Sequence, residues 1–187
     1  NNLIEKEENG VFIGDSYNKM AMSSTDVSVD EELLTSLYEN NKNSVVQITG
    51  MNESGSNTYG SGFFIREGVI VTTWSLFLQF LTNSNYIYVN DVYGNVYEVL
   101  GIVSAQSDYD VVVLKISEEV GKKVVLGKSD SIKSGDKVFT INSKSNNNFS
   151  INYGSNLSNG NGRIENVFAL SESDVGSALF NVSGEVI

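Results

Sequence analysis

Apolar and polar residues alternate in short runs along most of the chain after residue 43. Period-two runs rich in Val, Ile, Phe and Tyr predict β-strands, because successive side chains of a strand point to opposite faces. The runs cover residues 44–49, 62–65, 69–73, 86–89, 96–103, 111–116 and 137–141. Turn residues such as Glu67-Gly68 and Ser134-Gly135 separate them. Many short strands at this spacing predict a β-barrel or a β-sandwich.

The segment before the first strand has a different period. Acidic residues at positions 30–32 precede apolar residues at 33, 34, 37 and 38, which is the spacing of one helix face. With Asp30 as its N-terminal cap, this pattern predicts a short amphipathic helix. Residues 1–29 show no sustained period.

Two later segments have compositions of their own. Residues 142–162 are dense in Asn, Ser and Gly, and they predict a long solvent loop that holds one strand near residues 149–153. Residues 178–187 predict a hairpin that turns at Ser183-Gly184 and ends in the apolar pair Val186-Ile187.

The 187 residues include no His, no Cys and no Pro. Without imidazole or thiol, the chain has neither a Ser-His-Asp nor a Cys-His catalytic pair, and no zinc site built from His or Cys. We expect no metal and no cofactor. Hydrophobic residues make up 40% of the chain, enough apolar surface for a packed core.

The formal net charge is -11, and it is spread unevenly. Residues 1–40 hold nine acids and two bases, a net charge of -7, which leaves -4 for residues 41–187. The chain has no basic stripe of the kind that contacts a phosphate backbone, so we expect no nucleic-acid binding. Residues 1–29 are therefore interpreted as an acidic N-terminal extension.

No segment is apolar over the roughly 20 residues that a membrane-spanning helix needs. We therefore expect no membrane contact from this segment itself. The chain begins with Asn1, so we expect a processed piece of a longer protein whose targeting sequence is not visible. The lack of Cys fits both the cytosol and the outside of a bacterium.

Eight short motifs follow the predicted helix in a fixed order. They are SVVQI (44–48), GSGFFI (60–65), GVIVTT (68–73), SDYDVVVLKI (107–116), LGKSD (126–130), GDKV (135–138), GSALFN (176–181) and GEVI (184–187). In this order the chain resembles bacterial HtrA/DegP-like serine proteases of the trypsin fold. The resemblance covers roughly residues 30–187.

This resemblance implies an all-β, trypsin/chymotrypsin-like double β-barrel with short helices, formed by residues 30–187. The N-terminal barrel would comprise about residues 44–118 and the C-terminal barrel about residues 122–187, with a site in the cleft between them. The family fold continues past GEVI with another strand. We therefore expect the last barrel strand to be missing from this chain or to come from other residues.

The resemblance also implies positions for a catalytic triad. The general-base His of the family follows the strand that ends here as VTTW (71–74), where this chain has Ser75. The Asp precedes strand 111–116 and is retained as Asp110. The nucleophilic Ser corresponds to Val175. Two of the three positions therefore carry degenerate residues.

These departures predict the loss of catalysis. The Ser75 hydroxyl is a poor base near neutral pH, and Val175 has no nucleophilic atom. Ser173 replaces a family Gly in the loop with Asp174 and Gly176, so the amides that would stabilise an oxyanion are also in doubt. We expect a pseudoprotease rather than an enzyme, in which Asp110 simply accepts hydrogen bonds from Ser75 or nearby amides.

Four tyrosines surround one predicted turn. They are Tyr86, Tyr88, Tyr93 and Tyr97, and the first two lie on the same face of a strand. They could form a stacking platform for a sugar or a peptide, or they could pair across strands as part of the fold. Exposed, coplanar rings would favour the platform, and buried rings would weaken it.

The function implied by the resemblance is binding, to a protein, a polysaccharide or a neighbouring domain of the parent protein. One setting is an RsgI-type anti-sigma factor of a clostridium, whose extracytoplasmic HtrA-like pseudoprotease domain contributes to polysaccharide sensing. This setting implies that the domain lies outside the cytoplasm of a Gram-positive bacterium and that its parent protein is anchored in the membrane. Two alternatives are a protein-interaction or scaffolding module of the bacterial envelope, and a serine-type peptidase of unconventional mechanism.

Overall fold

The computed structural model describes residues 31–160, 163–168 and 170–187. The acidic extension predicted for residues 1–29 and the cap predicted at Asp30 lie outside these residues. Glu32–Ile187 forms one unit, which contains all the strands named below. No helix within the described part of the chain has the length and apolar character needed to cross a membrane.

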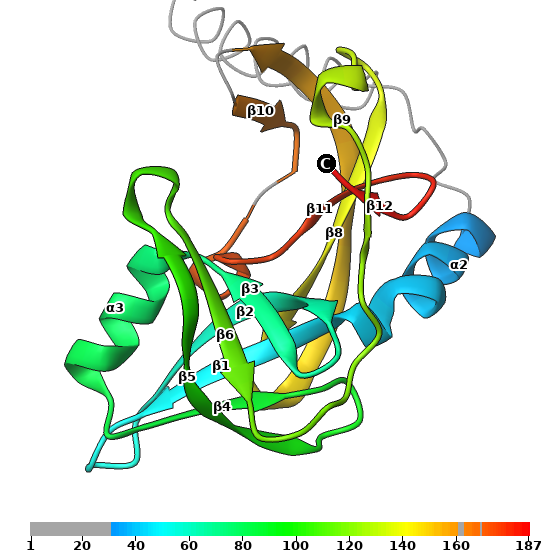
Figure 1. Ribbon diagram of the computed structural model, residues 1–187. Coiled ribbons are helices and arrows are strands. Elements are labelled where there is room, and N and C mark those ends of the chain that lie inside the picture. The colour runs from blue at the N-terminus through cyan, green and yellow to red at the C-terminus, as the bar shows by residue number, and fades with distance from the viewer. Residues whose placement is uncertain (1–30, 161–162, 169) are drawn as a thin grey trace, which may run out of the picture. The chain divides into compact units, whose positions relative to one another are not determined.

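Six antiparallel strands form a closed barrel in the N-terminal half of this unit (Figure 1). They are β1 (Val45–Met51), β2 (Asn57–Arg66), β3 (Val69–Thr72), β4 (Tyr86–Asn90), β5 (Val96–Gln106) and β6 (Val111–Ile116), paired in the order β1-β2-β3-β6-β5-β4. The strands β3 and β6 pair from Val69 opposite Lys115 to Thr72 opposite Val112. This register brings the residues after Thr72 next to those before Val111.

The alternating pattern of these strands fills the barrel with apolar side chains. Ile48, Ile70, Val89, Val112 and Leu114 are completely shielded from solvent. Removing such side chains from water is the main favourable contribution to folding, about 1.5–3 kcal/mol for each large apolar group. The inward positions therefore fix the register of the barrel, since a slip of one residue would turn its apolar face outward.

A second six-stranded sheet follows and remains open, with strand order β10-β9-β8-β11-β12-β7. Its strands are β7 (Val125–Leu126), β8 (Lys137–Lys144), β9 (Asn148–Gly160), β10 (Arg163–Asn166), β11 (Leu179–Asn181) and β12 (Glu185–Val186). Phe139 and Phe180 stack in its core with ring centroids 5.0 Å apart. Partly buried side chains of β2, among them Phe63, pack against this core, so the two sheets share an apolar contact.

Helices are few and short. The α-helices are α2 (Glu31–Asn41) and α3 (Trp74–Asn83), and the 3-10 turns are η1 (Lys42–Ser44), η2 (Ser107–Tyr109), η3 (Ser129–Ser131), η4 (Ser145–Asn147) and η5 (Glu172–Asp174). Helix α2 contributes Leu37 to the core of the second sheet. Helix α3 contributes Leu76, Phe77 and Phe80 to the core of the barrel.

The prediction of an all-β, double-barrel fold with short helices is confirmed. In the described residues the second sheet is open. The strand predicted near residues 149–153 is confirmed as part of β9, but the long solvent loop predicted around it is wrong for the described residues of 142–160. Strand β8 continues to Lys144, and β9 runs over thirteen residues from Asn148 to Gly160. Cross-strand pairing, from Lys137 opposite Ser155 to Lys144 opposite Asn148, overrides the weak strand propensity of the Asn- and Ser-rich sequence.

Candidate functional site

A groove of about 1060 Å³ lies where the barrel and the second sheet meet. Four segments line it: the start of β2, the first half of α3, the end of β8 with η4, and residues 171–175. The lining residues are Asn57, Thr58, Tyr59, Ser75, Leu76, Gln79, Lys144, Ser145, Ser171, Glu172, Ser173 and Val175. The two degenerate positions expected at Ser75 and Val175 therefore open into the same groove.

Asp110 lies at the N-terminus of helix α3, as the pairing of β3 with β6 requires. Its carboxylate accepts the Ser75 amide on Oδ1 at 2.6 Å and the Ser75 hydroxyl on Oδ2 at 2.9 Å. Its main-chain oxygen accepts the amide of Trp74 at 3.1 Å. The first amides of a helix have no partner inside the helix, and a negative charge there is favourable. Asp110 thus caps α3 from the turn between η2 and β6.

This cap should be measurable as stability. We expect Asp110→Ala to lower the free energy of unfolding by about 1–2 kcal/mol, because it removes both acceptors of Ser75 at the helix end. Urea unfolding of the purified protein measures the change. Asp108→Ala in the same η2 turn is the matched control and should change stability by less than about 0.5 kcal/mol. Equal losses in the two variants would contradict the capping role.

Val175 follows a 3-10 turn that is closed by its own side chains. The amide of Ser171 donates to Asp174 Oδ2 at 2.6 Å, and Ser171 and Asp174 together form a capping box. The amide of Val175 donates to the carbonyl of Glu172 at 3.4 Å. An amide bonded within the turn does not point to a ligand in the groove. The amide of Val175 therefore is not arranged as a free oxyanion donor.

A buried serine on β2 anchors this turn. The Ser61 amide donates to the carbonyl of Val175 at 2.9 Å, and its hydroxyl donates to the carbonyl of Ser173 at 3.0 Å. The same hydroxyl accepts the amide of Ser143 on β8 at 3.2 Å, while Thr72 Oγ1 donates to the carbonyl of Ser61 at 2.8 Å. Ser61 therefore connects the barrel, the second sheet and the degenerate loop.

The remaining residues of the predicted loop, Asp174 and Gly176, are packed against the rest of the fold. Asp174 is buried, and Gly176 adopts a φ of +88°, which favours glycine. A Cβ atom at residue 176 would overlap the carbonyl oxygen of Ser61 and the hydroxyl of Thr72. Among the described residues, no group of three or more acidic side chains gathers closely enough to hold a metal ion.

The four tyrosines do not share one surface, which weakens the alternative in which all four form a stacking platform. Tyr97 pairs with Val89 and points into the barrel, where its side chain is 5% exposed. Tyr88 is half-buried opposite Glu98, on the other face of the sheet, and Tyr86 is exposed near the start of β4. Tyr93 is exposed in the turn between β4 and β5. Strand alternation explains this separation.

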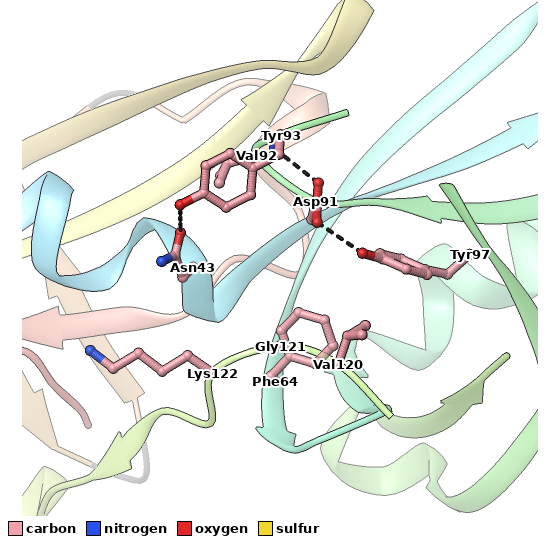
Figure 2. A pocket seen from close by; sticks show the side chains of 9 residues that line it. All are labelled: Asn43, Phe64, Asp91, Val92, Tyr93, Tyr97, Val120, Gly121 and Lys122. Atoms are coloured by element: carbon pink, nitrogen blue, oxygen red, sulfur yellow. Dashed lines mark hydrogen bonds between the residues drawn. The ribbon is translucent and has the colours of Figure 1, made fainter. Parts of the chain in front are cut away.

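Asp91 joins two of these tyrosines, as Figure 2 shows. Its carboxylate accepts the Tyr93 amide and the Tyr97 hydroxyl, each at 2.9 Å, and two donors of Asn95. Partial burial opposes ionisation of Asp91, but the donors of Asn95, Tyr97 and Tyr93 outweigh it and lower its pKa. Burial, with the hydrogen bond to Asp91 and its charge, raises the pKa of Tyr97 to about 12.

The raised pKa of Tyr97 predicts a loss of stability in alkali. A tyrosine in the unfolded chain ionises near pH 10. The stability that neutral Tyr97 contributes to the fold is therefore complete below that pH and disappears as the pH rises towards 12. We expect wild type to exceed Tyr97→Phe in stability by on the order of 2 kcal/mol near pH 9, and the difference to shrink by pH 12. Urea unfolding across this range measures it. If the difference in free energy of unfolding between wild type and Tyr97→Phe did not change with pH, the prediction would be wrong. Tyr86→Phe, at an exposed tyrosine, is the control and should show no such pH-dependent difference.

Sequence reasoning singled out Tyr93 and Tyr97 but missed Ser61 and the role of Asp91. Ser61 lies in the GSGFFI motif, but nothing in a single sequence shows that its hydroxyl meets Ser173, which is 112 residues away. Asp91 had a local signal. In an Asx turn an Asp side chain accepts the backbone amide two residues later, and an Asp shortly before a Gly, as in Asp91 to Gly94, is typical of such a turn.

Comparison with known proteins agrees with this architecture. No curated protein is a significant match to the sequence. Among solved structures, 447 chains match. One is the crystal structure of Deg5, an HtrA-family protein, with 25% identity and a TM-score of 0.72 over 87% of this chain and 86% of that chain. The model of the trypsin-like peptidase domain family matches residues 60–187, more than half of the chain. The chain therefore belongs to the trypsin-like peptidase domain family, with an HtrA-like fold.

Proposed function

We propose that this domain has no peptidase activity and acts by binding a segment of a protein partner in the groove. One observation carries the proposal: the hydroxyl of Ser75 donates its proton to Asp110, and Val175 stands at the end of the η5 turn. In a working triad, the residue between the carboxylate and the nucleophile accepts a proton from the nucleophile. Ser75 instead uses its proton to satisfy the carboxylate.

The oxyanion donors support the same conclusion. Catalysis of acyl transfer depends strongly on amides aimed at the developing negative charge, and loss of one donor costs about 10²–10³ in rate. The amide of Val175 is used inside the turn, and Ser61 holds the carbonyls of Ser173 and Val175 on the buried side. Restoring two side chains would therefore leave this part of the site unassembled.

The lining of the groove favours an uncharged, extended polypeptide. Neutral amides and hydroxyls predominate, among them Asn57, Thr58, Gln79 and Ser145. Tyr59 and Leu76 supply apolar surface, and Lys144 and Glu172 contribute one charge of each sign. Such a mixture of convergent polar groups and apolar patches fits the alternating backbone and side chains of a peptide.

Unstructured casein tests the first half of the proposal, the absence of peptidase activity. We expect wild-type protein to leave casein intact over long incubation, and the double variant Ser75→His, Val175→Ser to do the same, because the oxyanion amide remains committed. Turnover of casein by clean wild-type protein would establish instead a serine-type peptidase of unconventional mechanism, for which Ser75 and Asp110 would be the first residues to replace.

Binding is measured with labelled, extended peptides made only of uncharged residues. We expect at least one of them to bind wild type and to lose affinity for Val175→Arg, because Val175 is 41% exposed in the groove. Val96→Arg on β5, outside the groove and 59% exposed, is the matched control and should bind as wild type does. Failure of wild type to bind any of these peptides, or equal losses in the two variants, would reject the groove as a peptide site.

The cellular setting is a separate proposal, which rests on the resemblance to RsgI-type anti-sigma factors. In that setting the domain takes part in polysaccharide sensing outside the cell, and the alternative is a protein scaffold of the envelope. A pull-down with insoluble cellulose tests the sensing role. Retention no greater than that of an unrelated acidic protein would remove cellulose sensing for this domain.

A further inference from the structure

A second hollow lies on another part of the barrel, between the β4–β5 turn, the η1 turn and the segment 120–122. Its volume is about 250 Å³. Figure 2 shows the side chains that line it: Asn43, Phe64, Asp91, Val92, Tyr93, Tyr97, Val120, Gly121 and Lys122. Pockets for drug-sized ligands have roughly 300–1,000 Å³, so this one suits a ligand with a single ring.

Tyr93 forms an exposed aromatic wall that is fixed at both ends. Its side chain is 66% exposed, yet its hydroxyl donates to Asn43 Oδ1 and its amide to Asp91 Oδ1, each at 2.9 Å. Ordering a free side chain opposes binding, and here the fold has already ordered it. The ring is therefore pre-organised to stack on a ligand.

The floor of the pocket is apolar and rigid. Phe64 is 1% exposed, and Gly121 lies so close to it that a Cβ atom at residue 121 would overlap the ring. Val92 and Val120 continue the apolar lining, and both are half-buried. A ligand in this pocket would thus meet apolar surface as well as the ring of Tyr93.

The polar groups at the rim are mostly donors. The Lys122 ammonium gives one of its three protons to the carbonyl of Asn40. The side-chain carbonyl of Asn43 accepts from Tyr93, and its side-chain NH₂ group can only donate. Asp91 already accepts four hydrogen bonds, as many as a carboxylate has lone-pair sites, so it offers little to a cation.

We propose that this pocket binds one neutral pyranose ring, stacked on Tyr93 and hydrogen-bonded through its hydroxyl oxygens to Asn43 and Lys122. One face of a pyranose carries C–H groups with partial positive charge, which complement the negative face of an aromatic ring. Its hydroxyls supply the acceptors that the rim requires. The pocket is independent of the peptide groove, and it gives the sensing proposal a specific site.

NMR titration of the full chain with methyl glucoside, methyl mannoside and methyl galactoside tests the proposal. We expect at least one of them to shift the amide signals of Asn43, Tyr93, Gly121 and Lys122 with millimolar affinity. Tyr93→Ala should weaken binding roughly tenfold or more, while Tyr93→Phe keeps the ring and should weaken it less. Tyr86→Ala removes an equally exposed tyrosine outside the pocket and should leave affinity unchanged.

Three results would overturn the proposal. They are the absence of shifts at the pocket with all three glycosides, an equal loss of affinity in Tyr86→Ala and Tyr93→Ala, and shifts at the same amides with N-acetyl-tyrosinamide but not with the glycosides. The last result would identify a pocket for a protein side chain. Peptide binding in the groove and cellulose retention are measured separately, so failure of either leaves the glycoside result interpretable by itself.

Discussion

Gly176→Ala is expected to lower the free energy of unfolding by about 3–5 kcal/mol, the largest effect of any substitution at the degenerate site. Two costs combine. The residue has a φ of +88°, which opposes any side chain, and a Cβ atom would overlap the carbonyl oxygen of Ser61 and the hydroxyl of Thr72. The overlapped carbonyl belongs to a buried strand and has little freedom to move.

Gly135→Ala separates these two costs. Gly135 has nearly the same φ, +91°, but no atom lies within 4 Å of the Cβ position. Its substitution should cost only the backbone term, about 1–2 kcal/mol. Thermal unfolding followed by circular dichroism should show a fall in Tm of roughly 10 °C for Gly176→Ala and a much smaller fall for Gly135→Ala. Equal falls would show that steric overlap at Gly176 is relieved by local movement.

Ser61→Ala is expected to be the second most damaging change, with a loss of about 2–3 kcal/mol. The hydroxyl is the acceptor of the Ser143 amide and the donor to the Ser173 carbonyl, and alanine leaves both groups without that partner. Ser61 and Ser143 are buried, and Ser173 is half-buried. A buried polar group that loses its partner costs about 1–3 kcal/mol. The cavity left by one oxygen atom adds little.

The loss should also be visible locally. Because Ser61 anchors the carbonyl of Ser173, amide hydrogen exchange in residues 171–176 should become faster in Ser61→Ala than in wild type. Ser134→Ala, an exposed serine before Gly135, is the control and should change neither stability nor exchange. Loss of stability without faster exchange in this loop would mean that Ser61 supports the barrel alone.

Much of the fold could be predicted because the barrel strands have strong local signals. The run from Val111 to Ile116 is apolar, β-branched and bounded by turn residues, and the structure has β6 at those positions. The hairpin at Ser183-Gly184 was predicted for similar reasons, and β11 and β12 flank it. For β9 the sequence indicates only a short strand near residues 149–153, because Asn, Ser and Gly leave the full length of the strand to be decided by pairing with β8.

The candidate site could be predicted only in outline. The order of motifs indicates that residues 75, 110 and 175 lie near one cleft, and the structure brings Ser75 against Asp110 and places Val175 on the same groove. The partner of each individual hydrogen bond in the site cannot be predicted from the sequence. The commitment of the Val175 amide to Glu172 and the anchoring of Ser173 by Ser61 arise from packing between distant strands.

The cap formed by Asp110 affects how sequences of this family are interpreted. A carboxylate that completes the end of α3 is useful to the fold whether or not the protein cleaves anything. Its presence is therefore uninformative about activity, and a search for inactive relatives should not score the acidic position. The positions of Ser75 and Val175, both exposed to the groove, are the informative ones.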